Sequence, residues 1–306
     1  MTGGPVLPSC ALVFMANDRY RDWAVAFLES VRALDARLPL YCIPHRGSFA
    51  AIRLLRHTFG FEILEEGIER LDAFARRLYR FHPRHRANLR KYAALTLPVS
   101  EVAYFDIDLL LLVEPRRLFG HIRPGEIDLV YFATSPGWVY KARHLARAMS
   151  LFPDLRMISA GAFVTSPGAL TIDEIVGTVE ENWALYRELR RRRVYDQPVL
   201  NFALHRLGKR YRSIADLDPS LAGLVSFRNP NLQVVGGKPI DVSGGGEVVA
   251  IHWAGARKLR SDWAEPRTLQ LRGIRKAALA RGDERIRASA GQQRASSNDL
   301  RAQGHV

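Results

Sequence analysis

Apolar positions along the first 250 residues follow two periods in turn. Short apolar runs that predict buried strands alternate with segments whose apolar residues recur at helical spacing, as in residues 18–34. Strands are predicted at residues 11–15, 40–43, 62–64, 102–105, 128–133, 161–165, 211–214 and 248–252, and helices at 18–34, 49–59, 71–79, 88–97, 172–192 and 196–207. Strands alternating with helices predict one α/β domain, with a mostly parallel sheet covered by helices on both faces.

Two aspartates follow one of these apolar runs. Asp106 and Asp108 come directly after the strand at residues 102–105 and are followed by four leucines. In extended geometry, residues two apart point to the same side, and open α/β sheets bind ligands at the carboxyl ends of their strands. Two carboxylates on one side repel unless a cation lies beside them, and oxygen ligands suit Mg²⁺ or Mn²⁺. The pattern indicates a metal site; the alternative is an exposed strand end or turn, where aspartate is common.

Length, cysteine count and hydropathy exclude several classes of protein. The 306 residues allow a sizeable core, and two cysteines are too few for a disulfide framework or a cysteine-rich zinc site. The first residues do not have the pattern of a signal peptide, and no apolar stretch reaches the roughly 20 residues of a membrane helix. We therefore expect a cytoplasmic protein.

The net charge of +14 is unevenly distributed. Residues 256–306 contain 12 Lys or Arg against five Asp or Glu, so they hold half of the excess. They have no aromatic residue after Trp263, whereas single-stranded nucleic acid is bound by basic and aromatic residues together, so we expect no nucleic-acid partner. We predict a basic tail, helical or disordered, at 267–306, which either contacts an anionic membrane surface at its inner face or is a solvated extension without function.

Six short segments stand in a recognisable order along the chain. They are F-M-A-N-D-R-Y at 14–20, L-R-K-Y-A-A-L at 89–95, Y-F-D-I-D at 104–108, I-S-A-G-A-F-V at 158–164, D-Q-P-V-L-N at 196–201 and I-H-W-A-G-A-R-K at 251–258. Together they resemble the retaining GT-A nucleotide-sugar glycosyltransferases, the group that includes glycogenin and the bacterial lipopolysaccharide galactosyl- and glucosyltransferases. The resemblance implies a GT-A domain at residues 1–266 that moves a sugar from a nucleotide-sugar donor, a UDP-sugar in our interpretation, to an acceptor with retention.

The resemblance also implies roles for individual residues. Those expected to bind the nucleotide are Asn17 and Tyr20 at the base, and Arg90, Gly255 and Lys258 at the phosphates. Those expected around the donor sugar are Lys91, Ser159 and Gly161, with Asp196 and Gln197 next to the reacting carbon. The metal, Mn²⁺ or Mg²⁺, would be held by Asp106, Asp108 and His252.

The sequence departs from the family pattern at two places. Ser159 stands where the family has asparagine, and Leu259-Arg260 follows Lys258 where the family has Pro-Trp. The acceptor is not identified by any motif; a glycan, a lipid-linked sugar and a small molecule all remain open. Two other interpretations of the whole chain are a GT-A fold that has lost catalysis and only binds, and a basic nucleic-acid-binding protein.

Individual residues also have structural interpretations. Asp196 can be the N-cap of the helix that follows it, and His252 can be a hydrogen-bonded histidine at a strand end. The arginines at 190–193 are expected to form a solvated helix end that complements the helix dipole. Trp253, next to His252, is the aromatic residue that we would assign to stacking against an acceptor.

Overall fold

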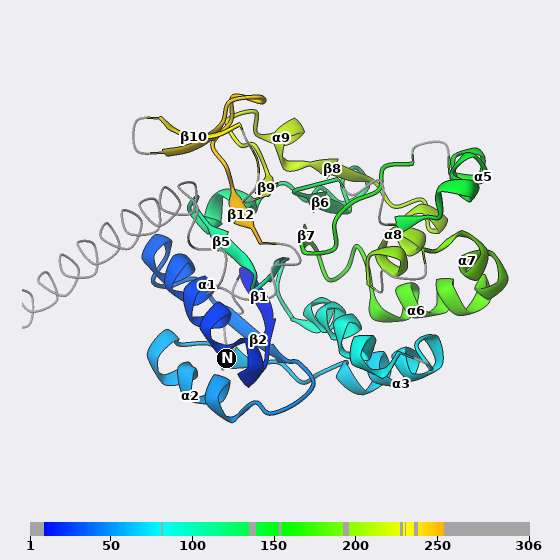
Figure 1. Ribbon diagram of the computed structural model, residues 1–306, viewed down its shortest axis with the longest axis horizontal. Helices are drawn as coiled ribbons and strands as arrows, with labels where there is room; N and C mark the ends of the chain where they lie inside the picture. Colours follow the sequence, from blue (N-terminus) through cyan, green and yellow to red (C-terminus); the bar gives the residue numbers. More distant parts are fainter. Residues whose placement is uncertain are drawn as a thin grey trace, which may run out of the picture.

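A seven-stranded sheet in the order β3-β2-β1-β4-β7-β6-β8 runs through the computed structural model (Figure 1). Its strands are β1 (Cys10–Ala16), β2 (Leu40–Pro44), β3 (Glu62–Ile63), β4 (Glu101–Asp106), β6 (Leu129–Tyr131), β7 (Ala162–Thr165) and β8 (Tyr211–Ser213). Only β7 runs antiparallel to its neighbours, β4 and β6, so the predicted mostly parallel sheet is confirmed. The structure describes residues 9–80, 82–134, 139–152, 155–191, 196–226, 229, 231–235 and 238–253.

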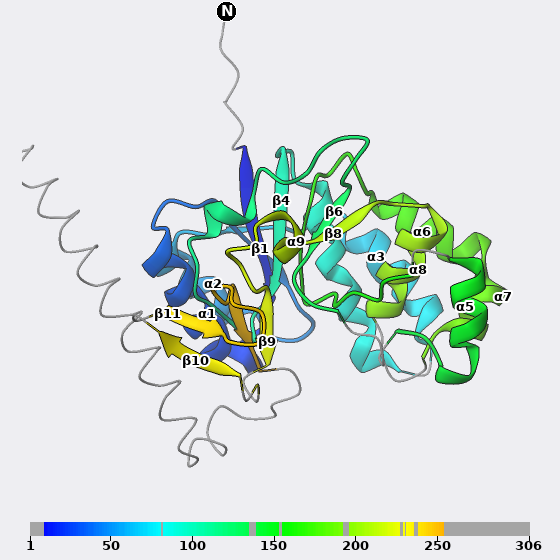
Figure 2. The same ribbon diagram turned by 90° about the horizontal axis from the view of Figure 1, so that it is seen from above.

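Two hydrophobic cores cover the two faces of this sheet. The helices are α1 (Arg21–Leu34), α2 (Ala50–Phe59), α3 (Ile68–Leu78), α5 (Leu145–Leu151), α6 (Ile172–Glu181), α7 (Trp183–Leu189), α8 (Gln197–Arg206) and α9 (Ile214–Leu217), with 3₁₀ helices η1 (Asp18–Tyr20), η2 (Pro83–Thr96), η3 (Pro115–Leu118) and η4 (Ala142–His144). One core contains side chains of α1 and α2, and the other those of α3, η2, α6 and α8 (Figure 2). Both faces are therefore covered, as the alternating strands and helices predicted.

Alternation along β4 decides which face receives its polar end. Val102 and Tyr104 belong to the core under α3, η2, α6 and α8, whereas Ala103 and Phe105 belong to the core under α1. Asp106, two residues after Tyr104, therefore turns toward η2 and α8. The chain then leaves the strand at Ile107, so the extended geometry that we predicted through Asp108 ends at Asp106.

A second, three-stranded sheet was not predicted from the sequence. It pairs β5 (Leu109–Leu111) with β12 (Ala250–His252) antiparallel and β12 with β9 (Leu224–Ser226) parallel, and a hairpin of β10 (Leu232–Val235) and β11 (Lys238–Asp241) lies apart from it as its own two-stranded sheet. The predicted strand at 248–252 thus belongs to this small sheet and not to the main one. Its pairing with β5 places His252 opposite Leu109, directly after Asp108.

Two predicted helices differ from the structure. The expected helix at 172–192 is divided at Asn182, which leaves α-helical geometry (φ −109°, ψ 31°) and separates α6 from α7. Asparagine favours such positions because its side chain bonds the local backbone, here through Nδ2 to the carbonyl of Thr178 at 2.9 Å. The expected helix at 88–97 is the second half of η2. No helix in the described part of the chain is long and apolar enough to cross a membrane.

Gly223 joins the two sheets and generates the first prediction. Its φ of +71° suits glycine, and a Cβ there would overlap the carbonyl oxygen of Phe132, which also accepts the N–H of Leu224 at 2.8 Å. Gly223→Ala should lower the free energy of unfolding by about 2–5 kcal/mol, through left-handed strain and this overlap. Gly120→Ala is the matched control, because Gly120 has a φ of +84° with open space around it, and should cost about 1–2 kcal/mol. Equal losses in urea titrations of the two variants would contradict the proposed contact.

Candidate active site

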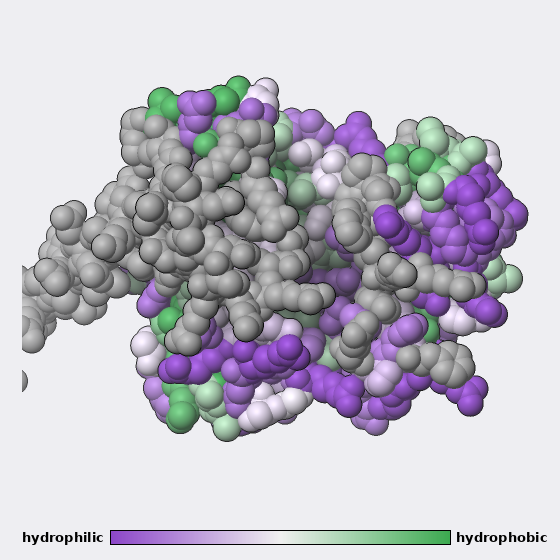
Figure 3. Space-filling view, viewed as in Figure 1, coloured by the Kyte–Doolittle hydropathy of each residue, from purple (hydrophilic) through white to green (hydrophobic). Residues whose placement is uncertain are grey.

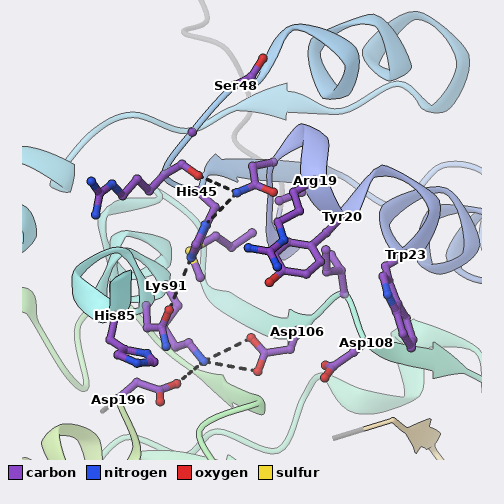
Figure 4. Close-up of a pocket in the computed structure, with 17 residues that line it drawn as sticks. Arg19, Tyr20, Trp23, His45, Ser48, His85, Lys91, Asp106, Asp108 and Asp196 are labelled. Atoms are coloured by element: carbon purple, nitrogen blue, oxygen red, sulfur yellow. Dashed lines mark hydrogen bonds and ion pairs between the residues drawn. The ribbon is translucent and has the colours of Figure 1, made fainter. Parts of the chain in front are cut away.

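A pocket of about 890 Å³ opens at the carboxyl ends of β1, β2 and β4 (Figure 4). Asn17 follows β1, His45 follows β2, and Asp106 ends β4. Lys91 of η2 and Asp196, at the start of α8, close its floor. The rule that places ligands at this edge of an α/β sheet therefore locates the site correctly.

The ammonium of Lys91 lies at the centre of this floor. Its side chain is 2% exposed, and Nζ lies 2.6 Å from Asp196 Oδ2 and 3.2 Å from Asp106 Oδ1. Nζ also donates to the carbonyl of Ala160 at 3.1 Å, and the hydroxyl of Tyr104 donates to Asp106 Oδ1 at 2.6 Å. A buried strand can therefore end in the carboxylate of Asp106, because the Lys91 ammonium neutralises it and the Tyr104 hydroxyl donates a hydrogen bond to it.

The two aspartates keep Lys91 charged. Burial alone would lower the pKa of Lys91, but the negative charges of Asp106 and Asp196 more than offset this effect and raise that pKa above its ordinary value. Burial, helped by the charges of Asp108 and Asp196, raises the pKa of Asp106 above its ordinary value even though Lys91 opposes the shift. The carboxylates of Asp106 and Asp196 repel each other, so their arrangement depends on the ammonium of Lys91.

Asp196 occupies the N-cap position of α8 without capping it. Its backbone is already in the right-handed helical region, and its side chain accepts no bond from the first turn. The carboxylate is directed to Lys91, while its main-chain carbonyl accepts the hydroxyl of Tyr92 at 3.0 Å. The alternative that Asp196 serves as a helix cap is therefore excluded.

The residues after Asp196 are tied to the entry of β7. Gln197 Nε2 donates to Ser159 Oγ at 3.4 Å, and Ser159 Oγ accepts the N–H of Gly161 at 3.3 Å. Buried Asn201 exchanges two bonds with the backbone of Ile158, at 2.8 and 2.9 Å. Ser159 and Gly161, predicted at the donor sugar, are thus brought together with Gln197, predicted next to the reacting carbon.

The side chains of Asp108 and His252 lie next to each other. Nε2 of His252 lies 3.3 Å from Oδ1 of Asp108, yet that oxygen is buried and makes no hydrogen bond with the described residues. Burial would lower the pKa of His252, but Asp108 reverses that effect and raises it. Gly161 leaves space beside both ligand candidates, because a Cβ there would lie 3.0 Å from Asp106 Oδ2 and 3.6 Å from His252 Cε1.

These side chains fit a divalent cation by their chemistry. Two carboxylates and an imidazole are oxygen and nitrogen donors of the kind that Mn²⁺ accepts, and the buried Oδ1 of Asp108, which accepts no hydrogen bond from the described residues, is free to bind a cation. Within residues 9–253, as far as the structure describes them, no three His, Cys, Asp or Glu side chains form a closed metal-binding group. The three-ligand metal site at Asp106, Asp108 and His252 therefore stays a prediction.

The other end of the pocket presents a buried amide. Asn17 is 6% exposed; its Nδ2 donates to the carbonyl of Arg46 at 2.6 Å and contacts Nδ1 of His45 at 3.1 Å, whereas its Oδ1 makes no hydrogen bond with described residues. Tyr20, 41% exposed, lines the same end. Both residues predicted at the base thus lie in the pocket.

His45 was missed from the sequence. Burial lowers the pKa of His45, so the neutral ring can accept from Asn17 through Nδ1 and donate from Nε2 to Asn88 Oδ1 at 3.4 Å. These two hydrogen bonds of His45 fix the orientation of the Asn17 amide, so that its oxygen remains available as an acceptor. The sequence did offer one signal for His45, its position directly after the strand β2. The rule that ligands bind at the carboxyl ends of strands, which we applied to Asp106, applies to His45 as well.

Some predicted residues are not brought to the pocket. Arg90 directs its guanidinium to both carboxylate oxygens of Asp72, at 2.8 and 2.6 Å, and to the carbonyl of Pro44, and it does not line the pocket. Successive residues of a 3₁₀ helix point about 120° apart, so only its neighbour Lys91 faces inward. Trp253 contacts the pocket residue Trp23 edge to face, with ring centres 6.4 Å apart. Gly255, Lys258 and the tail at 267–306 lie outside the described residues.

Comparison with known proteins identifies the fold. No protein-family model and no curated protein matches the sequence. The structure resembles the galactosyltransferase LgtC in complex with donor and acceptor sugar analogues (16% identity, 88% of this chain, 95% of LgtC, TM-score 0.56) and an active-site mutant of LgtC (18%, 86%, 95%, 0.57). It also resembles the bifunctional glycosyltransferase WbbM (16%, 84%, 48%, 0.54). The chain therefore has the fold of these glycosyltransferases, as its motifs predicted.

The ion pairs of Lys91 generate the second prediction. Lys91→Met keeps most of the apolar stem of the side chain but leaves Asp106 and Asp196 without their common cation, so the free energy of unfolding at pH 7 should fall by about 3–5 kcal/mol. The deficit should shrink toward pH 5, because burial already raises the pKa of Asp106 and the loss of Lys91 raises it further, so that Asp106 takes up a proton. Lys91→Met combined with Asp196→Asn is the control and should recover part of the loss. A change below about 1 kcal/mol for Lys91→Met would contradict this assignment.

Proposed function

We propose that this protein is a glycosyltransferase that transfers a sugar from a UDP-sugar to an acceptor with retention, assisted by Mn²⁺ or Mg²⁺. One observation carries the proposal. A single pocket in this fold has a buried amide acceptor and an exposed tyrosine at one end, and the carboxylates of Asp106, Asp108 and Asp196 at the other. Retention rests on the family resemblance of the motifs.

The base end favours uridine. Asn17 Oδ1 is a buried acceptor without a hydrogen bond from any described residue. The imide N–H of uracil is a donor that would satisfy it, whereas cytosine has an acceptor at the same ring position. The ring of Tyr20 is exposed enough to stack on a base. The neutral ring of His45 keeps the amide in this orientation.

The middle of the pocket would receive the diphosphate. A divalent metal bound by Asp106, Asp108 and His252 would neutralise the leaving diphosphate as a Lewis acid. Arg19 and Arg46 line the same pocket and add fixed positive charge for the phosphates. By the family resemblance, Gly255 and Lys258 join them, and Arg90 would do so only after releasing Asp72.

Asp196 would act at the reacting carbon. Its carboxylate lines the pocket and is held in place by Lys91, so it can stabilise the positive charge that develops on the sugar as the bond to the diphosphate breaks. By the family resemblance, Ser159 and Gly161 would contact the donor sugar, and Gln197, which donates to Ser159, would lie next to the reacting carbon. Lys91 fixes both this carboxylate and Asp106, so it links the sugar end to the metal end.

A non-catalytic binding module is the second candidate. Lys91 and Tyr104 already satisfy Asp106, a carboxylate that a metal would need. In this alternative the protein binds a UDP-sugar but does not turn it over. Hydrolysis of UDP-sugars with Mn²⁺ and no acceptor separates the two, because only the enzyme releases UDP.

The third prediction is metal dependence. Release of UDP from a UDP-sugar should be lost in excess EDTA and restored by Mn²⁺, because the leaving diphosphate is then no longer neutralised. Asp108→Asn should abolish release while the melting temperature holds or rises, since the variant removes a carboxylate that repels Asp106. Full activity in EDTA would refute metal assistance. A large fall in melting temperature in Asp108→Asn would favour a structural role for that residue.

The fourth prediction concerns the basic tail. We propose that residues 267–306 bring the enzyme to the inner face of an anionic membrane, where a lipid-linked acceptor would be concentrated; the sequence composition supports this. The full chain should sediment with anionic vesicles at low salt and not with neutral ones, and a chain ending at Pro266 should remain in solution. Absence of sedimentation with anionic vesicles at low salt would exclude membrane contact and favour a soluble acceptor.

A further inference from the structure

A second pocket, of about 800 Å³, lies between the end of α3 and α7. Its lining includes Arg77, Arg80, His82, Trp183, Arg187 and Arg190, none of which has a role in the proposed transfer. Hydrophilic residues gather at this end of the molecule (Figure 3). Arg190, which we predicted as part of a solvated helix end, is the C-cap residue of α7 and lines this pocket.

The positive charge of the pocket is only partly neutralised. Arg77 pairs with Glu180, and the carboxylate of Glu188 in the lining pairs with Arg147 at 2.6 Å, outside the pocket. Among the described residues, no carboxylate lies within 4.0 Å of the guanidinium of Arg187 or Arg190. Two guanidinium groups thus keep their charge for a ligand.

Aromatic rings hold these two guanidinium groups in place. Arg187 lies over Trp183 at 5.8 Å and Arg190 over Tyr186 at 5.5 Å, and the two rings stack with centres 6.1 Å apart. A guanidinium that stacks on a ring keeps the N–H groups at its edge available for a planar anion and loses less freedom when it binds. The pocket is therefore pre-organised for phosphate or carboxylate.

One segment of the chain contributes to both pockets. His82 lines the second pocket, and His85, three residues along the chain, lines the first. Arg86 donates to the carbonyls of Tyr79 and Arg80, at 3.2 and 3.0 Å, and ties this segment to the end of α3.

We propose that the α3–α7 pocket is a second ligand site that binds the phosphate or carboxylate of an anionic sugar. Arg187 and Arg190 would hold the charge, and the ring of Trp183, 37% exposed, offers apolar surface to the sugar. Its volume suits a small ligand in a concave site. We assign this site to the acceptor, an assignment that rests on the proposed function; the acceptor would then be an anionic glycan.

Calorimetric titration of the full chain with glucose 6-phosphate, glucuronate and glucose tests the site. At least one of the two anions should bind, more weakly with added salt, and glucose should not; the anion that binds identifies the group recognised. Arg187→Gln and Arg190→Gln should each weaken that binding at least tenfold. Arg76→Gln is the matched control, because Arg76 is an exposed arginine of α3 outside the pocket, and should change it less than twofold.

The site would be overturned if neither anion binds in the millimolar range, or if glucose binds as tightly as the anions. It would also be overturned if Arg187→Gln and Arg190→Gln both bind the anion as the wild type does while keeping the wild-type melting temperature. Titration of UDP into the same variants separates this proposal from the first. UDP affinity should be unchanged in Arg187→Gln, because the nucleotide pocket is intact. If UDP-sugars prove not to be substrates while the anion still binds, only the acceptor assignment is lost.

Discussion

The buried ammonium of Lys91 connects segments of the chain that are far apart in sequence. It bridges Asp106 at the end of β4 and Asp196 before α8, and it also donates to the carbonyl of Ala160 before β7. Without this cation the two carboxylates would repel each other. The floor of the pocket therefore exists because one cation satisfies both, and every proposed role of the sugar end depends on that arrangement.

The site lies where two sheets meet. Asp106 ends a strand of the main sheet, and His252 ends a strand of the small sheet. The pairing of β12 with β5 sets His252 opposite Leu109, and its Nε2 lies 3.3 Å from Oδ1 of Asp108. Gly223 ties β9 to the main sheet at Phe132, so the small sheet has a fixed position. A metal site with ligands from both sheets would be sensitive to any change in the relative placement of the sheets. A substitution at Gly223 could therefore alter metal binding even though Gly223 is not itself a ligand.

The excess of positive charge has at least three separate locations. Lys91 is neutralised inside the core, and Arg90 is held by Asp72. Arg187 and Arg190 line a second pocket. Net charge alone allowed nucleic acid, an anionic membrane surface or small acidic molecules as partners, and the position of these two arginines in a concave site favours the last.

The sequence by itself determined the alternation of strands and helices, the ligand edge at Asp106 and, through the order of its motifs, the fold, because periodicity and strand ends are local properties. Only the tertiary structure decided that Lys91 and not Arg90 faces the pocket, that Asp196 pairs instead of capping, and that 248–252 joins a second sheet. A charged side chain takes the partner that packing brings within about 4 Å, and that partner can lie a hundred residues away. The spacing of residues along the sequence does not predict which partner that will be.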